Sequence, residues 1–201
     1  MPTQRLGGFH AQADRARDLI GVGQSVAAMT ANRIDGSDLY RAALVHAVAA
    51  LDSYVHGVVL DRAVDILMMR TPAGGGNKVG LHFGAISQIV AAAENGPAEM
   101  EMVSRTYISE RLGLETYQRP DDISKALAMV GVGKIWSAAF GKGATSRQTA
   151  LGLIVSRRNR IVHECDLDPL NPGFITPLSA DDAVSAVQAI RSIVAGIDSR
   201  C

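Results

Sequence analysis

Apolar residues recur at three- and four-residue spacings along almost the whole chain, and no segment shows the strict apolar/polar alternation of a half-buried strand. The first helical segment runs from about residue 11 to residue 33 and places Leu19, Val22, Val26 and Met29 on one face. A turn at residues 35–37 follows, in which Ser37 has the hydroxyl of a helix N-cap. The second helix, from Asp38 to about Arg70, is expected to be the longest.

Five further helices are expected after a glycine-rich loop at residues 71–77. They cover about 81–94, 98–112, a stretch that begins at Pro120, 146–163 and 179–197. Pro120 precedes two acidic residues, as at many helix starts, and Ser179 with Asp182 has the spacing of a capping box. We therefore predict an all-α fold, a bundle of about seven helices in a single domain over residues 1–201, with residues 1–10 as a flexible N-terminus.

Charge, cysteine count and apolar runs limit the kinds of ligand, site and compartment to be expected. The chain has 20 acidic and 20 basic residues and a formal net charge of zero, so any contact with nucleic acid must be local. Its 2 cysteines, Cys165 and Cys201, are too few for a disulfide framework or a cysteine zinc site. The N-terminus lacks a signal-peptide pattern, and no uninterrupted apolar run reaches the roughly 18 residues of a membrane span. These features predict a cytoplasmic protein.

Chemistry-bearing residues gather at the end of the helix expected over 146–163. The sequence there reads Arg157-Arg158-Asn159-Arg160-Ile161-Val162-His163. An imidazole moves protons and guanidinium groups carry phosphate charge, so the segment holds the parts needed to cleave an RNA phosphodiester without a metal. The expected reaction is internal transesterification, which leaves a 2′,3′-cyclic phosphate and a 5′-hydroxyl. No cofactor and no metal site are expected.

Helical geometry constrains how these residues work together. Asn159 and His163 are four apart and share a face, so the amide can orient the imidazole. Arg158 and His163 are five apart, about 140° round the helix. Either the long arginine reaches round, or the helix frays, or a second copy of the chain completes the site. We favour the second copy, because a two-fold axis brings two such segments face to face.

Other interpretations of the charged residues stand beside this one. Arginine and histidine near a helix C-terminus commonly cap carbonyl groups. A second Arg-x4-His, from Arg41 to His46, lies in an apolar helix and is attributed to chance or to the core. Four residues are weaker candidates for supporting the imidazole: Asp52, His56, Glu164 and Asp166. Asp52 and His56 lie four apart on one helix, so they also fit an exposed helical ion pair.

The chain resembles the HEPN superfamily, whose signature is Arg-x4–6-His with a polar residue often following the arginine. Here that signature is Arg158-Asn159-x-x-x-His163. The resemblance to the RiboL-PSP-HEPN branch covers about residues 38 to 180. It includes the early long helix at residues 43–56, a middle section at 117–123 with the later Trp136, and the end at 157–164 leading to Asp168-Pro169.

The resemblance implies an α-helical, usually dimeric, metal-independent endoribonuclease of the kind found as toxins or phage-defence effectors. It implies Arg158 and His163 as the catalytic pair and Asn159 as their polar support. Because the net charge is zero, RNA binding is expected to depend on a dimer groove that gathers Arg157, Arg158 and Arg160 from both copies. RNA, a second copy and an antitoxin or defence partner protein are the partners expected. Some HEPN toxins carry an AMP-accepting tyrosine two residues after the histidine, where this chain has Cys165. A HEPN-type binding or scaffold module without catalysis is the alternative.

Overall fold

The computed structural model describes residues 3–74, 76–171 and 173–201, and these form helices without a named strand. Residues 1–2 of the predicted flexible N-terminus and Gly75 of the predicted glycine-rich loop lie outside the described residues, as does Pro172. The predicted all-α bundle is confirmed, with the short α6 and η1 added to the expected helices. In chain order the elements are α1 Gln4–Met29, α2 Ser37–Leu67, α3 Phe83–Glu94, α4 Pro97–Leu112, α5 Pro120–Met129, α6 Ile135–Phe140, η1 Gly141–Gly143, α7 Ala144–Glu164 and α8 Ala180–Asp198.

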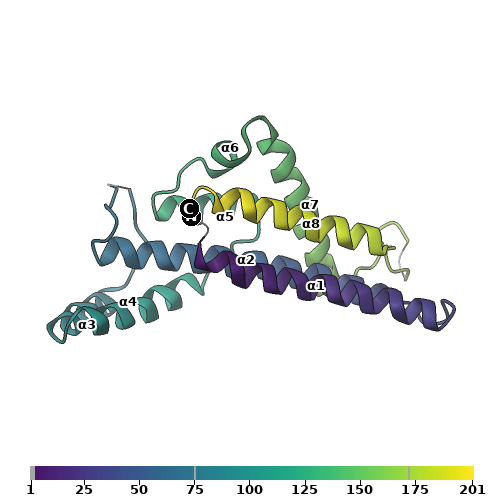
Figure 1. The fold of residues 1–201 in the computed structure, drawn as a ribbon, viewed down its shortest axis with the longest axis horizontal. Coiled ribbons are helices and arrows are strands. Elements are labelled where there is room, and N and C mark those ends of the chain that lie inside the picture. The colour runs from purple at the N-terminus through teal and green to yellow at the C-terminus, as the bar shows by residue number, and fades with distance from the viewer. Residues whose placement is uncertain (1–2, 75, 172) are drawn as a thin grey trace.

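Helix α2 is the centre of the bundle. It packs against α1, α4, α5, α7 and α8, and Figure 1 shows α1 and α8 lying along it while α3 and α4 extend from one end. By length and composition α2 would be able to cross a membrane, but 61% of its most apolar window is buried inside the fold. The apolar character of α2 is therefore explained by its place at the core.

Helix α1 lies antiparallel to α2 through a different face from the one predicted. The exposed fraction is 52% for Val22 and 80% for Met29, so the predicted face is wrong. The side of α1 that meets α2 carries mostly small residues, which let two helices approach closely: Phe9, Ala13, Ala16, Ile20 and Gly23. At the turn the approach requires glycine, because a Cβ on Gly36 would lie 2.3 Å from the carbonyl oxygen of Gly23.

Residues 4–10, expected to be flexible, form the first turns of α1. Phe9 is buried and packs edge-on against Tyr54 of α2 at 5.9 Å between ring centroids. The buried Asp198 of α8 accepts hydrogen bonds from the Tyr54 hydroxyl at 2.9 Å and from the Thr3 backbone at 3.1 Å. Burial and the nearby Asp198 carboxylate raise the pKa of the Tyr54 hydroxyl. Packing and these bonds outweigh the low helix propensity of Gly7 and Gly8.

The predicted signals for helix starts are confirmed at α8 and α5 but not at α2. Ser179 and Asp182 form the predicted capping box at the start of α8, with the Asp182 amide donating to Ser179 Oγ at 3.1 Å. Pro120 begins α5 as predicted. Gly36, rather than Ser37, precedes the first residue of α2, and the Ser37 hydroxyl donates to Asp35 instead. Helix α7 extends through all the candidate catalytic residues and ends at Glu164.

Candidate active site at the end of α7

Helix α7 stays regular to its last turn, which carries His163. His163 is exposed, and it makes no side-chain hydrogen bond with the residues that the structure describes. Because the helix continues to Glu164, fraying does not bring Arg158 and His163 together. Within one chain the two residues are separated by about 140° round the helix axis. Of the three arrangements considered, a long reach by Arg158 and completion by a second copy remain.

Arg158 is held by its neighbour in sequence. Its Nη1 donates to Asn159 Oδ1 at 3.0 Å, and its Nε is buried without a partner in the described part of the chain. Asn159 therefore contacts the arginine, and within the described residues its side chain makes no hydrogen bond with His163. Arg158 forms no ion pair with a described carboxylate, so its charge is available to an anion.

Arg160 is the arginine nearest to His163 along the helix surface. The two residues are three apart on α7 and hence on neighbouring positions of one face. The positive charge of Arg160 also reaches Asp168. Hydrogen bonds from Asn171 and from the Leu170 backbone are the main causes that lower the pKa of the Asp168 carboxyl, and the charge of Arg160 adds a smaller lowering. Arg160 also lacks a carboxylate ion pair among the described residues. A phosphate beside His163 would therefore meet Arg160 first.

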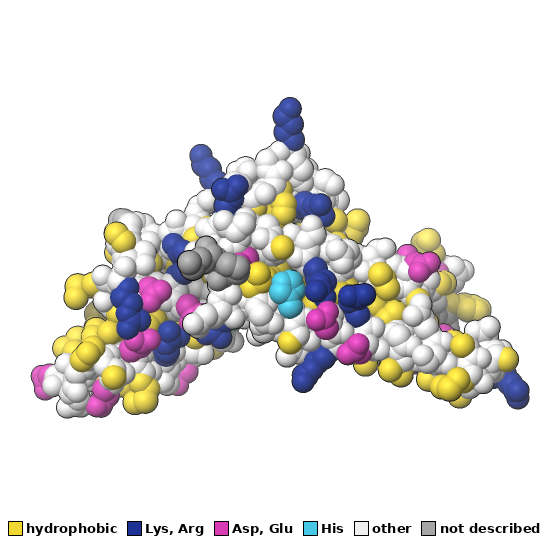
Figure 2. All heavy atoms as spheres, in the orientation of Figure 1, with side chains coloured by type: hydrophobic (Ala, Val, Ile, Leu, Met, Phe, Trp, Pro, Cys, Tyr) yellow, Lys and Arg dark blue, Asp and Glu magenta, His cyan; other side chains and the backbone are white. Residues whose placement is uncertain are grey.

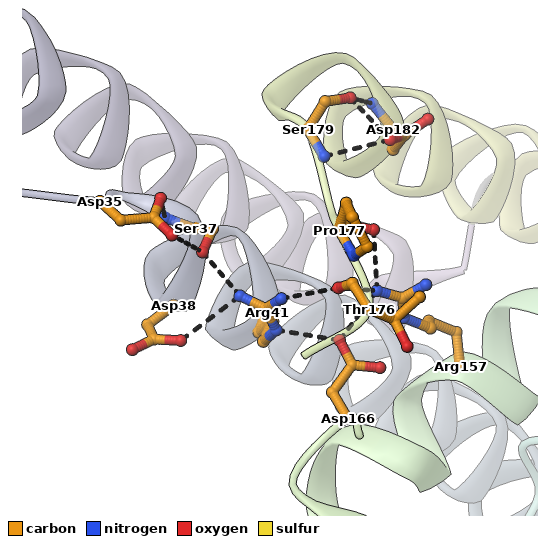
Figure 3. Close-up of polar contacts among 10 residues, drawn as sticks. All are labelled: Asp35, Ser37, Asp38, Arg41, Arg157, Asp166, Thr176, Pro177, Ser179 and Asp182. Atoms are coloured by element: carbon orange, nitrogen blue, oxygen red, sulfur yellow. Dashed lines mark hydrogen bonds and ion pairs between the residues drawn. The ribbon is translucent and has the colours of Figure 1, made fainter. Parts of the chain in front are cut away.

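Arg157, predicted to bind RNA, is engaged inside the chain. Its Nη2 donates to Asp166 Oδ2 at 2.8 Å and to the carbonyl oxygens of Thr176 at 2.9 Å and Pro177 at 3.1 Å. Figure 3 shows the guanidinium turned toward these three groups. The geometry gives Arg157 a structural position, and leaves Arg158 and Arg160 as the arginines of this segment open to a ligand.

A second arginine, from α2, meets the same carboxylate. Arg41 is 8% exposed; its Nε donates to Asp166 Oδ2 at 2.9 Å, and its Nη2 donates to the Thr176 carbonyl at 2.8 Å (Figure 3). Asp166 itself is fully buried. We call Arg41, Arg157, Asp166 and Thr176 the Asp166 cluster. Of the two explanations for Arg41, chance and a place in the core, the core placement is the one observed.

The segment after α7 folds back on the helix as a short hairpin. The amide of Thr176 donates to the carbonyl of Asp166, and that of Asp168 donates to the carbonyl of Phe174, each at 2.8 Å. Leu167 and Ile175 form an isolated antiparallel bridge. The Asp166 cluster therefore fixes both ends of this hairpin, at Asp166 and Thr176, beside the turn of α7 that carries His163.

Asp52 and His56, predicted as weak supporting residues for His163, make their hydrogen bonds to other parts of the fold. Asp52 Oδ1 accepts from the Tyr117 amide at 2.5 Å, and His56 Nδ1 lies 2.9 Å from the Asp52 carbonyl oxygen. The other His56 nitrogen is 3.2 Å from the Leu112 carbonyl oxygen. These contacts fasten the segment after α4 to α2. Glu164 is exposed at the end of α7 and makes no side-chain hydrogen bond with a described residue.

An apolar groove of about 730 Å³ lies beside the candidate site. It lies between α1, α2 and the end of α7. Ile161 of α7 and Cys165, which follows α7, are among the residues that line it. Side chains from the other elements complete the lining, among them Leu19, Val45, Ala49 and Ile175. The described residues contain no group of three or more His, Cys, Asp or Glu side chains placed to hold a metal ion.

Comparisons with known proteins find no relatives: no family model matches the chain, and no curated protein and no solved structure is significantly similar to it.

Proposed function

We propose that the protein is an endoribonuclease whose active site is built from His163 of one copy and Arg158 of another. The observation that carries the proposal is the end of α7. There an exposed imidazole stands beside Arg160, and Arg158 and Arg160 have no carboxylate partner among the described residues. An arginine that forms no ion pair is able to attract an anion such as a phosphodiester.

The proposed chemistry needs proton transfer and charge stabilisation only. One His163 removes the proton of a ribose 2′-hydroxyl, whose oxygen attacks the adjacent phosphorus. The P–O5′ bond breaks, and an imidazolium returns a proton to the leaving 5′-oxygen. Guanidinium groups of Arg158 and Arg160 stabilise the extra negative charge on the phosphorane. The RNA must be single-stranded or looped at this point, since a flexible backbone lets the 2′-oxygen align with the scissile bond.

Helix geometry supports a site shared between two copies. Arg158 and His163 point about 140° apart on a regular α7, so a second α7 related by a two-fold axis supplies the missing group for each. The apolar groove shares Ile161 and Cys165 with this helix end. A second copy seated on the groove would bury this apolar surface and bring the two His163 side chains to one cleft.

A non-catalytic binding module is the second candidate function. It is favoured by the engagement of Arg157 with Asp166 and by the scattered surface charge. Figure 2 shows basic and acidic side chains intermingled on one face, without a continuous basic surface. Such a module would use Arg158 and Arg160 to recognise an acidic partner. In that case RNA would stay intact while Arg158→Ala would weaken the partner complex.

The cellular role follows from the sequence resemblance and belongs to the same proposal. The HEPN-like signature at Arg158, Asn159 and His163 suggests a toxin or phage-defence effector that acts on RNA in the cytoplasm. An antitoxin or defence-system protein would then control it. Cys165 stands where some HEPN toxins have an AMP-accepting tyrosine, so control by that modification is not part of the proposal.

The products of RNA cleavage test the proposed chemistry. Purified protein incubated with a fluorescent single-stranded RNA in excess EDTA is expected to yield fragments with 2′,3′-cyclic phosphate and 5′-hydroxyl ends. The reason is that attack by the 2′-oxygen retains the phosphate on the 3′ side. Phosphatase and kinase treatment followed by mass spectrometry identifies these ends. Fragments with 5′-phosphate ends, or cleavage that appears only when Mg²⁺ is added, would contradict the mechanism.

A further inference from the structure

The turn that follows His163 has an unfavourable backbone conformation. Cys165 and Asp166 both have left-handed φ angles, 52° and 56°, although neither is glycine. Consecutive left-handed residues with a Cβ are disfavoured, and they persist only where surrounding contacts hold them. The Asp166 amide donates to the Arg160 carbonyl at 3.0 Å, a bond that closes the end of α7. The orientation of the last turn of α7 thus depends on what holds Asp166.

The Asp166 cluster holds this turn from two helices. Arg41 of α2 and Arg157 of α7 converge on one oxygen of the Asp166 carboxylate and on the carbonyl of Thr176 (Figure 3). The anchor points therefore belong to the central helix and to the body of α7 itself. With Asp166 fixed in this way, Cys165 and the preceding His163 have little freedom to move independently of α2.

The cluster is not arranged for stability alone. Three of its side-chain atoms are buried without a hydrogen-bond partner in the described residues: Asp166 Oδ1, Arg157 Nε and Thr176 Oγ1. Buried polar atoms that lack partners are costly, and apolar side chains of similar volume are often as stabilising as a buried ion pair. The distinctive property of the cluster is its geometry: two guanidinium groups donate to the same oxygen of Asp166 and to the same carbonyl oxygen of Thr176.

We infer that Arg41 and Asp166 are positioning residues for His163: they lock the left-handed turn after α7 to α2 and so fix the backbone position from which the imidazole projects. The catalytic consequence rests on the proposed nuclease function, whereas the structural consequence does not. Neither residue touches RNA in this arrangement. Their effect passes through the backbone of residues 163–166.

The chain offers a matched pair of variants to test this. Asp166 accepts hydrogen bonds from Arg41 and Arg157, and Asp61 accepts them from Arg5 and Arg105. Arg41→Gln and Arg5→Gln each remove one arginine and leave the aspartate with the other. Arg41 and Asp61 are twenty residues apart on α2, about 30 Å along its axis. Each variant is compared with wild type by ¹³C–¹H NMR of the histidine rings, by thermal unfolding, and by RNA cleavage.

Arg41→Gln is expected to shift and broaden the His163 ring signals while the His56 and His82 signals stay in place. It should also lower kcat about tenfold or more with little change in KM, because a small misplacement of a catalytic group is costly. Arg5→Gln should change neither. Unchanged His163 signals in a folded Arg41→Gln protein would overturn the inference, as would equal changes in both variants. If wild type cleaves no RNA, the proposed function fails, and the NMR comparison still decides the positioning role.

Discussion

His163→Ala is expected to reduce RNA cleavage by about 10² to 10⁴-fold, the contribution typical of a general acid or base. In the proposed site no other imidazole replaces it, since His56 contacts the Asp52 and Leu112 carbonyl oxygens and His46 contacts Gln12. The side chain is exposed at the end of α7, so its truncation should change the free energy of unfolding by less than about 0.5 kcal/mol. Single-turnover cleavage of a labelled RNA in EDTA measures the effect.

A histidine elsewhere in the fold provides the control. His82 caps α3 by accepting a hydrogen bond from the Ala85 amide at 3.0 Å, and asparagine is able to replace it in that role. His82→Asn should therefore cleave RNA at the wild-type rate. Cleavage that survives His163→Ala would refute the assignment of His163, and equal loss in both variants would point to a general effect of histidine replacement.

Asp166→Ala is expected to destabilise the protein by about 3–5 kcal/mol, because it removes the buried carboxylate that the buried Arg41 and the largely buried Arg157 share. Arg41 and Arg157 both donate to Asp166, and their other acceptors are uncharged carbonyl and hydroxyl oxygens apart from the exposed Asp38. This loss is a large part of a typical folding free energy of about 5–15 kcal/mol. Urea unfolding followed by circular dichroism measures it.

The exposed counterpart of this substitution is Asp61→Ala. Asp61 also meets two arginines, but the side chains of all three residues are between 33% and 42% exposed. Water solvates the arginines left behind, so the loss should be only about 1 kcal/mol or less for each exposed pair. If Asp61→Ala were as destabilising as Asp166→Ala, burial would not explain the loss expected for Asp166→Ala.

The fold could be predicted from sequence wherever the signal is local. Helical spacing located α2, a proline marked the start of α5, and a four-residue Ser–Asp pattern gave the capping box of α8. The N-terminal turns of α1 were missed because Gly7 and Gly8 disfavour a helix, and the contacts that override them come from Tyr54 and Asp198. The buried face of α1 was missed because alanine and glycine, rather than large apolar residues, make the contact.

For the candidate site too, only the local features could be predicted from the sequence. The spacing of Arg158, Asn159 and His163 on one helix was visible, including the 140° separation that a regular α7 preserves. The contact between Arg41 and Asp166 joins residues 125 positions apart, and nothing in either local sequence indicates it. Arg157 differs from Arg158 because its charge is already paired with Asp166 inside the fold, and the local sequence does not indicate that pair either.

Sharing of the active site between two copies is tested most directly by mixing two inactive variants. Arg158→Ala and His163→Ala are coexpressed with different affinity tags and purified together, and RNA cleavage is measured in EDTA. Purification over both tags in turn selects mixed dimers. In these one site lacks both groups and the other has both, so roughly half of the wild-type activity should return. Arg158→Ala paired with the double variant provides the inactive reference. Activity that stays at this reference level would place both groups in one chain and contradict the shared site.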